Sequence, residues 1–89
     1  MKIDVYDTYA TSTKGKIIHF DVLLQSGGTK ETALQYARSF LTSIGEKADA
    51  LKSERCNFCH TETAHPVVEV AIAKSGHYIL QMEGCPDPA

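Results

Sequence analysis

The sequence predicts an α+β fold, with a four-stranded mixed sheet and two helices packed on one face. Three observations predict it: two opening segments rich in β-branched and aromatic residues, two later segments with apolar residues at helical spacing, and a short apolar run near the end. Because 89 residues suffice for one domain only, we expect a single domain over residues 1–85 and a disordered tail over 86–89.

The first two strands are expected to form an antiparallel hairpin. Residues 2–9 are rich in β-branched and aromatic side chains, and residues 16–24 (KIIHFDVLL) place apolar side chains at alternate positions. Between them, residues 11–15 (TSTKG) are polar and end in a glycine that can adopt a positive φ, which is typical of a turn.

Two helices follow from apolar spacing and capping residues. Thr29 is a suitable N-cap and Gly45 a suitable C′ residue for the first helix. Its apolar stripe comprises Ala33, Leu34, Ala37, Phe40, Leu41 and Ile44. The second helix is expected to start at Pro66, which suits a first helical turn, and to end at Gly76.

The remaining two strands are predicted from weaker signals. Residues 48–52 are charged and poorly patterned, so a third strand there is expected mainly because the topology needs one, and a bent loop is the alternative. Residues 77–82 (HYILQM) predict the last strand. Right-handed crossovers would then make strands two, three and four broadly parallel, which gives the mixed sheet.

Charge and hydropathy exclude several function classes. Nine basic and eleven acidic residues give a net charge of −2, and no basic block is present to bind nucleic acid. No segment approaches the ~20 apolar residues that span a membrane. Aspartates interrupt the opening residues, which is not typical of a secretory signal, so we expect a cytoplasmic protein. The partner is unknown, and a homodimer is one option.

One Cys and His cluster stands out, because residues 56–65 contain two thiols and two imidazoles. Cys56 and Cys59 could direct both sulfurs at one zinc ion, with Cys85 as third ligand if the strands preceding Cys56 and Cys85 end at one sheet edge. The fourth ligand would be His60 or His65, of which His65 is geometrically easier. Four protein ligands would make this zinc site structural.

Three other interpretations of the cluster compete with zinc. Cys56 to His60 matches the CxxCH pattern that attaches c-type haem, but haem is disfavoured because the chain lacks an export signal and enough apolar surface. A thiol redox protein could use Cys56 or Cys59 for attack and Cys85 as the resolving thiol. The cysteines could also be ordinary thiols in a non-catalytic interaction module.

A second polar site is suggested by His19 and Asp21, which point to the same side of the second strand. Such a pair can share a ligand or a proton, although a solvated polar pair on a half-exposed sheet is the commoner arrangement. No catalytic residues are nominated, because the other acids are scattered and no nucleophile motif is present, so an enzyme is not favoured.

Several short strings, taken in order, resemble a small bacterial family of domains of unknown function. They extend over nearly the whole chain and are Asp7-Thr8-Tyr9, His19-Phe20-Asp21-Val22, Cys56-x-Phe58-Cys59-His60 and Met82-Glu83-Gly84-Cys85. The resemblance implies a compact domain of bacterial origin with no established activity or cofactor. It also implies that His60, rather than His65, acts with the three cysteines.

Overall fold

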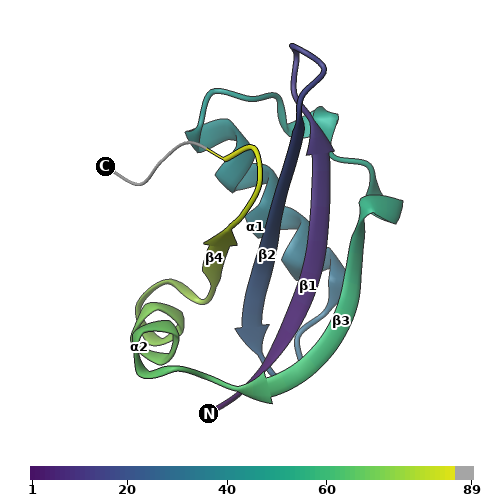
Figure 1. Ribbon diagram of the computed structural model, residues 1–89. Helices are drawn as coiled ribbons and strands as arrows, with labels where there is room; N and C mark the ends of the chain where they lie inside the picture. The colour runs from purple at the N-terminus through teal and green to yellow at the C-terminus, as the bar shows by residue number, and fades with distance from the viewer. Residues whose placement is uncertain (86–89) are drawn as a thin grey trace.

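The computed structural model describes residues 1–85, and the predicted tail over 86–89 lies outside the described residues. Its elements follow the order strand, strand, helix, strand, helix, strand, with two short 3₁₀ turns before the third strand (Figure 1). They are β1 (Lys2–Thr11), β2 (Ile17–Gln25), α1 (Lys30–Ser43), η1 (Ala48–Ala50), η2 (Ser53–Arg55), β3 (Cys56–Thr63), α2 (Pro66–Ser75) and β4 (Tyr78–Gln81).

The four strands form one sheet in the order β3-β1-β2-β4, and every neighbouring pair is antiparallel. The predicted α+β class, four strands and two helices are confirmed, but the predicted mixed sheet is wrong. A parallel return needs a crossover that carries the chain back to the opposite end of the sheet. Instead α2 lies beside the end at which β3 finishes, and β4 starts from that end (Figure 1). β4 therefore runs antiparallel to β2.

The two helices pack against different faces of the sheet, which corrects the expectation that they share one. α1 packs into a core that includes Tyr6, Phe20 and Val22. α2 packs against Ile3 and Leu23, which alternate onto the opposite face. The physical reason is that the central strands are apolar on both sides near one end of the sheet, so each side needs a cover.

The predicted hairpin and helix ends are confirmed. β1 pairs with β2 in one continuous antiparallel register. The Thr29 hydroxyl caps α1 by accepting a hydrogen bond from the Thr32 amide at 3.2 Å. α2 begins at Pro66, and Gly76 ends it with φ 84°, a left-handed conformation that glycine adopts without steric cost. Local sequence signals therefore determine where both helices begin and end.

The third strand lies at residues 56–63 rather than at 48–52. The bent-loop alternative holds for the earlier segment, where η1 and η2 flank Leu51, whose side chain is buried in the core. In β3 only Cys56 is buried, so its sequence shows none of the apolar alternation that usually predicts a strand. Its register with β1 shifts between Val5 and Tyr6, which leaves Cys59 as an extra, bulged residue.

Asp4 connects three parts of the sheet end. Its carboxylate accepts hydrogen bonds from Thr61 Oγ1 at 2.7 Å, Ser26 Oγ at 3.0 Å and the Gly27 amide at 3.1 Å. The Thr61 hydroxyl lowers the pKa of Asp4 most, with help from Gly27 and Ser26 and against the opposing effect of burial. The carboxylate thereby links β1 to β3 and to the loop before α1.

We expect Asp4→Asn to lower the free energy of unfolding by about 1–2 kcal/mol at neutral pH. The NH₂ group of the asparagine side chain would then face one of the hydrogen-bond donors that the Asp4 carboxylate accepts from, and that donor would lose its partner. A lowered folded-state pKa stabilises the protein above the usual value of 3.8, and that gain is lost as pH falls through the folded value. Urea unfolding at pH 7 and pH 3 should show the difference shrinking in acid. Thr61→Val, which removes one donor, should cost less, and equal costs at both pH values would contradict the assignment.

Candidate functional site

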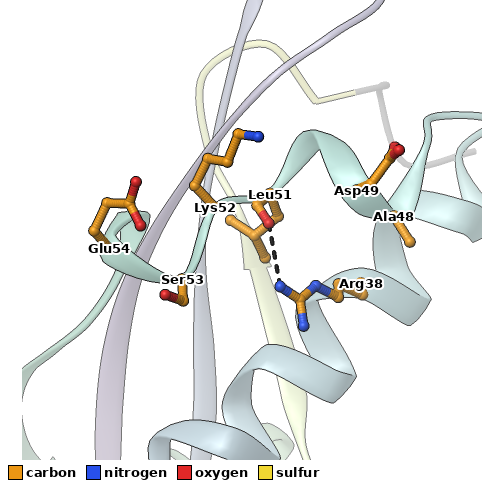
Figure 2. A pocket seen from close by; sticks show the side chains of 7 residues that line it. All are labelled: Arg38, Ala48, Asp49, Leu51, Lys52, Ser53 and Glu54. Carbon is orange, nitrogen blue, oxygen red and sulfur yellow. Dashed lines mark hydrogen bonds between the residues drawn. The ribbon is translucent and has the colours of Figure 1, made fainter.

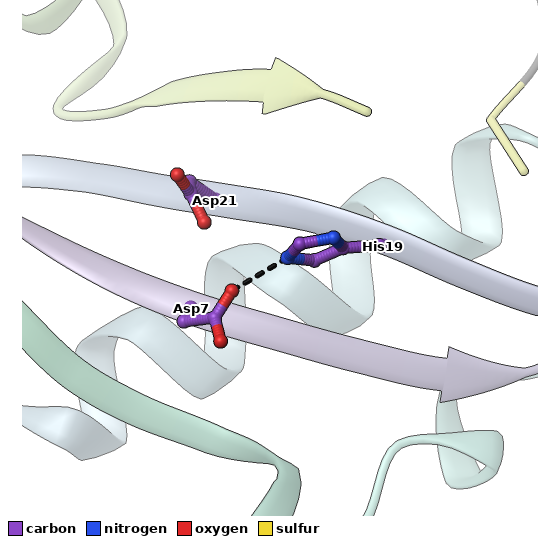
Figure 3. Close-up of side chains that lie close together, drawn as sticks. All are labelled: Asp7, His19 and Asp21. Carbon is purple, nitrogen blue, oxygen red and sulfur yellow. Dashed lines mark hydrogen bonds and ion pairs between the residues drawn. The ribbon is translucent and has the colours of Figure 1, made fainter. Parts of the chain in front are cut away.

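Asp7, His19 and Asp21 gather on the part of the sheet that α2 leaves open (Figure 3). One ligand atom from each side chain lies within 4.8 Å of the other two. Asp7 Oδ1 is 2.5 Å from His19 Nε2, so the carboxylate and the imidazole share a short hydrogen bond. The three side chains come from two adjacent strands and converge on one point above the sheet.

The pairing register of the hairpin assembles this group. Asp7 lies directly opposite Asp21, and Tyr9 lies directly opposite His19. Cross-strand partners project from the same face, so all four side chains point to the same side. The Tyr9 ring stacks on the His19 imidazole with centroids 4.3 Å apart and planes inclined by 13°. This stacking holds the imidazole beside the carboxylates.

The electrostatics of the group are those of a crowded acidic pair. Burial raises the pKa of Asp21 most, the Asp7 carboxylate raises it further, and His19 partly opposes both effects. The same Asp7 carboxylate raises the pKa of the Tyr9 phenol. A positive charge placed between Asp7 and Asp21 would relieve their repulsion, whether it is a proton or a cation.

The donor set has the composition of a divalent metal site. It offers one imidazole nitrogen and two carboxylate groups, which are ligands used by zinc and other first-row transition metals. Three protein ligands leave at least one coordination position open, as in catalytic zinc sites and unlike closed structural ones. Among residues 1–85 this is the one group of three or more His, Cys, Asp or Glu side chains with metal-binding geometry.

The four predicted zinc ligands are not brought together. Cys56 is buried on the α1 side, beside the Thr8 hydroxyl at 3.6 Å, whereas Cys59 is exposed at the bulge. His60 projects to the other face, 3.5 Å from Glu62. Cys85 follows β4, and its thiol donates a hydrogen bond to the His19 carbonyl. β4 and β3 are the two edge strands of the sheet, three strand spacings or ~14 Å apart. Zinc binding by this set stays a prediction.

The alternative ligand His65 has a structural role. It is the N-cap of α2, and its Nδ1 accepts a hydrogen bond from the Val67 amide at 3.3 Å. Such a cap satisfies one of the free amides at the start of a helix. The Nδ1 atom that caps the helix is therefore occupied in this conformation.

The redox interpretation gains no support from the thiol environments. Burial raises the pKa of the Cys56 thiol and of the Cys85 thiol. A raised pKa lowers the fraction of reactive thiolate, whereas redox-active cysteines depend on a lowered one. Thiol redox chemistry therefore also stays a prediction from the sequence.

Sequence reasoning found two of the three residues of the group. The His19 and Asp21 pair was predicted from strand alternation, and the structure places both side chains on one face as expected. Asp7 was missed as their partner, because its position opposite Asp21 depends on the hairpin register. Counting back from a turn centred on Lys14 would have paired Asp7 with Asp21.

Two larger hollows lie elsewhere on the surface. The first, about 560 Å³, lies between α1 and the 3₁₀ turns, where Arg38 donates to the Leu51 carbonyl at 3.3 Å (Figure 2). It carries both charge signs, from Arg38, Lys52, Asp49 and Glu54. The second, about 340 Å³, is a mainly apolar groove beside α2, lined by residues that include Val67 and Leu80. Neither hollow is lined by Asp7, His19 or Asp21.

The fold and the site define a small α+β domain with a His and carboxylate cluster on an antiparallel sheet. The chain belongs to the family described as Domain of unknown function (DUF2024), whose model matches residues 1–82. It is similar to the NMR structure of protein NE1680 from Nitrosomonas europaea, with 42% sequence identity and a TM-score of 0.84. That match covers 97% of this chain and 100% of the other. No curated protein matches the chain.

These findings confirm the predicted resemblance to a family of domains of unknown function, and the similar solved structure is that of a bacterial protein. Across residues 1–85, neither helix has the length and hydropathy needed to cross a bilayer.

We expect Asp21→Asn to raise the free energy of unfolding at pH 7, by less than about 1 kcal/mol because solvent screens the site. Since the folded-state pKa of Asp21 is raised, the folded protein binds more protons than the unfolded one as pH rises above 3.8, and ionisation then costs stability. The gain should vanish in acid, where the wild-type carboxyl is neutral. Thermal unfolding between pH 3 and 8 measures it in metal-free buffer.

The control for this experiment is Asp49→Asn, because Asp49 is an exposed acid on η1, away from the group. It should leave stability nearly unchanged at every pH. A lower stability of Asp21→Asn at pH 7 would contradict the inferred repulsion between the two carboxylates.

Proposed function

We propose that the domain binds one divalent transition-metal ion through Asp7, His19 and Asp21 and leaves coordination positions open for a ligand. The observation that carries this proposal is the convergence of the three donor atoms within 4.8 Å. The site lies on the open part of the sheet, so water and small molecules can reach it. Its carboxylates face each other, and a cation would convert their repulsion into attraction.

The donor chemistry favours zinc, manganese or iron(II) over magnesium and calcium. Magnesium and calcium prefer oxygen ligands, whereas an imidazole nitrogen suits the first-row transition metals. A metal with one His and two carboxylate ligands keeps a position for water or substrate, and bound metal lowers the pKa of such a water. The proposed role is therefore binding or activation of a ligand at the metal, rather than support of the fold.

The stacked Tyr9 and the short Asp7 contact give His19 a defined orientation. In the metal-bound form the Nε2 atom would turn from Asp7 to the ion, and Tyr9 would continue to hold the ring plane. Metal-binding imidazoles commonly depend on such neighbouring groups for their orientation. Tyr9 is thus a positioning residue in the proposed site.

Native mass spectrometry and calorimetric titration with Zn²⁺ and Mn²⁺ test the proposal. We expect one ion per chain, and a stability gain of about 2.7 kcal/mol at a free metal concentration 100 times the Kd. Asp21→Asn should abolish binding although it stabilises the metal-free protein. His19→Gln should weaken it at least tenfold.

The matched controls are Cys56→Ser and Cys59→Ser, which leave the Asp7, His19 and Asp21 donors intact. Retained binding in both variants, with loss in Asp21→Asn, assigns the ion to the sheet site. Loss of the ion in the cysteine variants and its retention in Asp21→Asn would instead support the predicted Cys and His zinc site. No binding by any protein would leave a His and carboxylate group that is neutralised by protons alone.

A further inference from the structure

A small cavity lies next to the proposed metal site, at the end of β1. Its volume is about 210 Å³, which is enough for a group the size of a sulfate or phosphate. Tyr9 lines this cavity and also stacks on His19, so the two sites share one residue. The full lining consists of Tyr9, Ala10, Thr11, Ala50, Lys52 and Arg55.

A backbone amide of β1 points into this cavity. β3 pairs with β1 only as far as Thr8, so the strand beyond it has β2 on one side alone. His19 exchanges both of its backbone hydrogen bonds with the β4 side, through Glu83 and Met82. In an antiparallel pair the opposing residue must then direct its own N–H away from β2. The N–H groups of Tyr9 and, two residues on, Thr11 therefore point to the β3 side. The pairing of Thr8 with Cys56 already uses the Tyr9 N–H, because a pair that exchanges no hydrogen bonds of its own is held by the bonds of the residues on either side of it. The Thr11 amide is then the one that faces the cavity.

Two basic side chains, Lys52 and Arg55, complete the lining. Within residues 1–85, neither forms an ion pair or a side-chain hydrogen bond. Lys52 lines both this cavity and the larger hollow between α1 and the 3₁₀ turns, and its ammonium group points away from Arg38 (Figure 2). The cavity therefore combines two cations with one free backbone donor, and its lining contains no carboxylate.

We propose that this cavity binds the oxyanion group of a small-molecule ligand, such as a phosphate ester or a carboxylate. Lys52 and Arg55 supply the charge, and the Thr11 amide supplies a directed donor. The further part of the ligand would then extend past Tyr9 towards Asp7, His19 and Asp21. That extension rests on the proposed function, whereas oxyanion binding itself does not.

An NMR titration of the metal-free protein with sodium sulfate, at constant ionic strength, tests the oxyanion site alone. We expect the amide signals of Tyr9 and Thr11 to shift and to saturate. Lys52→Gln and Arg55→Gln should each weaken sulfate binding about tenfold, and the double variant should abolish it. Lys74→Gln, which removes a lysine from α2, is the matched control and should bind sulfate like the wild type.

A parallel titration with sodium acetate tests planar oxyanions. Saturable shifts of Tyr9 and Thr11 with either anion support the proposal, and the pair of results distinguishes a phosphate-like from a carboxylate-like ligand. Shifts that are absent with both anions, or that persist unchanged in the Lys52 and Arg55 double variant, overturn it.

Repeating the sulfate titration in protein saturated with Zn²⁺ separates the two proposals. If the sites adjoin as proposed, zinc should tighten sulfate binding several-fold, and Asp21→Asn should remove that increase. Sulfate binding without any zinc uptake would overturn the metal site and retain the oxyanion site. Zinc uptake without sulfate binding would do the reverse.

Discussion

The pairing register between β1 and β2 is the constraint on which the rest of the structure depends. It determines that Phe20 enters the core under α1 and that Asp21 projects to the other side. A slip of one residue would exchange the two faces, placing carboxylates in the core and Phe20 in water. The apolar stripe of α1 thus enforces the register, and the same register brings Asp7 opposite Asp21. The geometry of the site follows from the packing of the core on the opposite face.

The sheet face on which α2 packs has apolar rows at one end and a polar row beyond them, and this division also determines the site. α2 covers only the end of that face, where it packs on Ile3, Val5 and Leu23. The next row contains Asp7, which is half-buried, and Asp21, which is buried, at the margin of this cover. That partial burial raises the pKa of Asp21 and would strengthen its interaction with a cation compared with a fully solvated carboxylate. The short length of α2 is therefore part of the site.

The sequence predicts those parts of the fold whose signals lie within a few neighbouring residues. The hairpin, Thr29, Pro66 and Gly76 were predicted because turn and capping preferences act over a few residues. The strand directions were not, because they depend on which end of the sheet α2 occupies. β3 was missed because seven of its eight residues are exposed, and residues 56–60 resemble a ligand motif more than a strand. In the structure, extension of the chain separates Cys56, Cys59 and His60 onto different sides.

The exposed, bulged character of β3 also bears on how the protein behaves among other proteins. An edge strand presents unpaired amides and carbonyls to which another chain can add, and long flat apolar edges are the most prone to it. Here one edge is polar and interrupted at Cys59, and the other, β4, is only four residues long. Neither offers a straight apolar template for strand addition. The exposed polar residues and the bulge of β3, which make it hard to predict as a strand, thus also disfavour fibrillar aggregation through this edge.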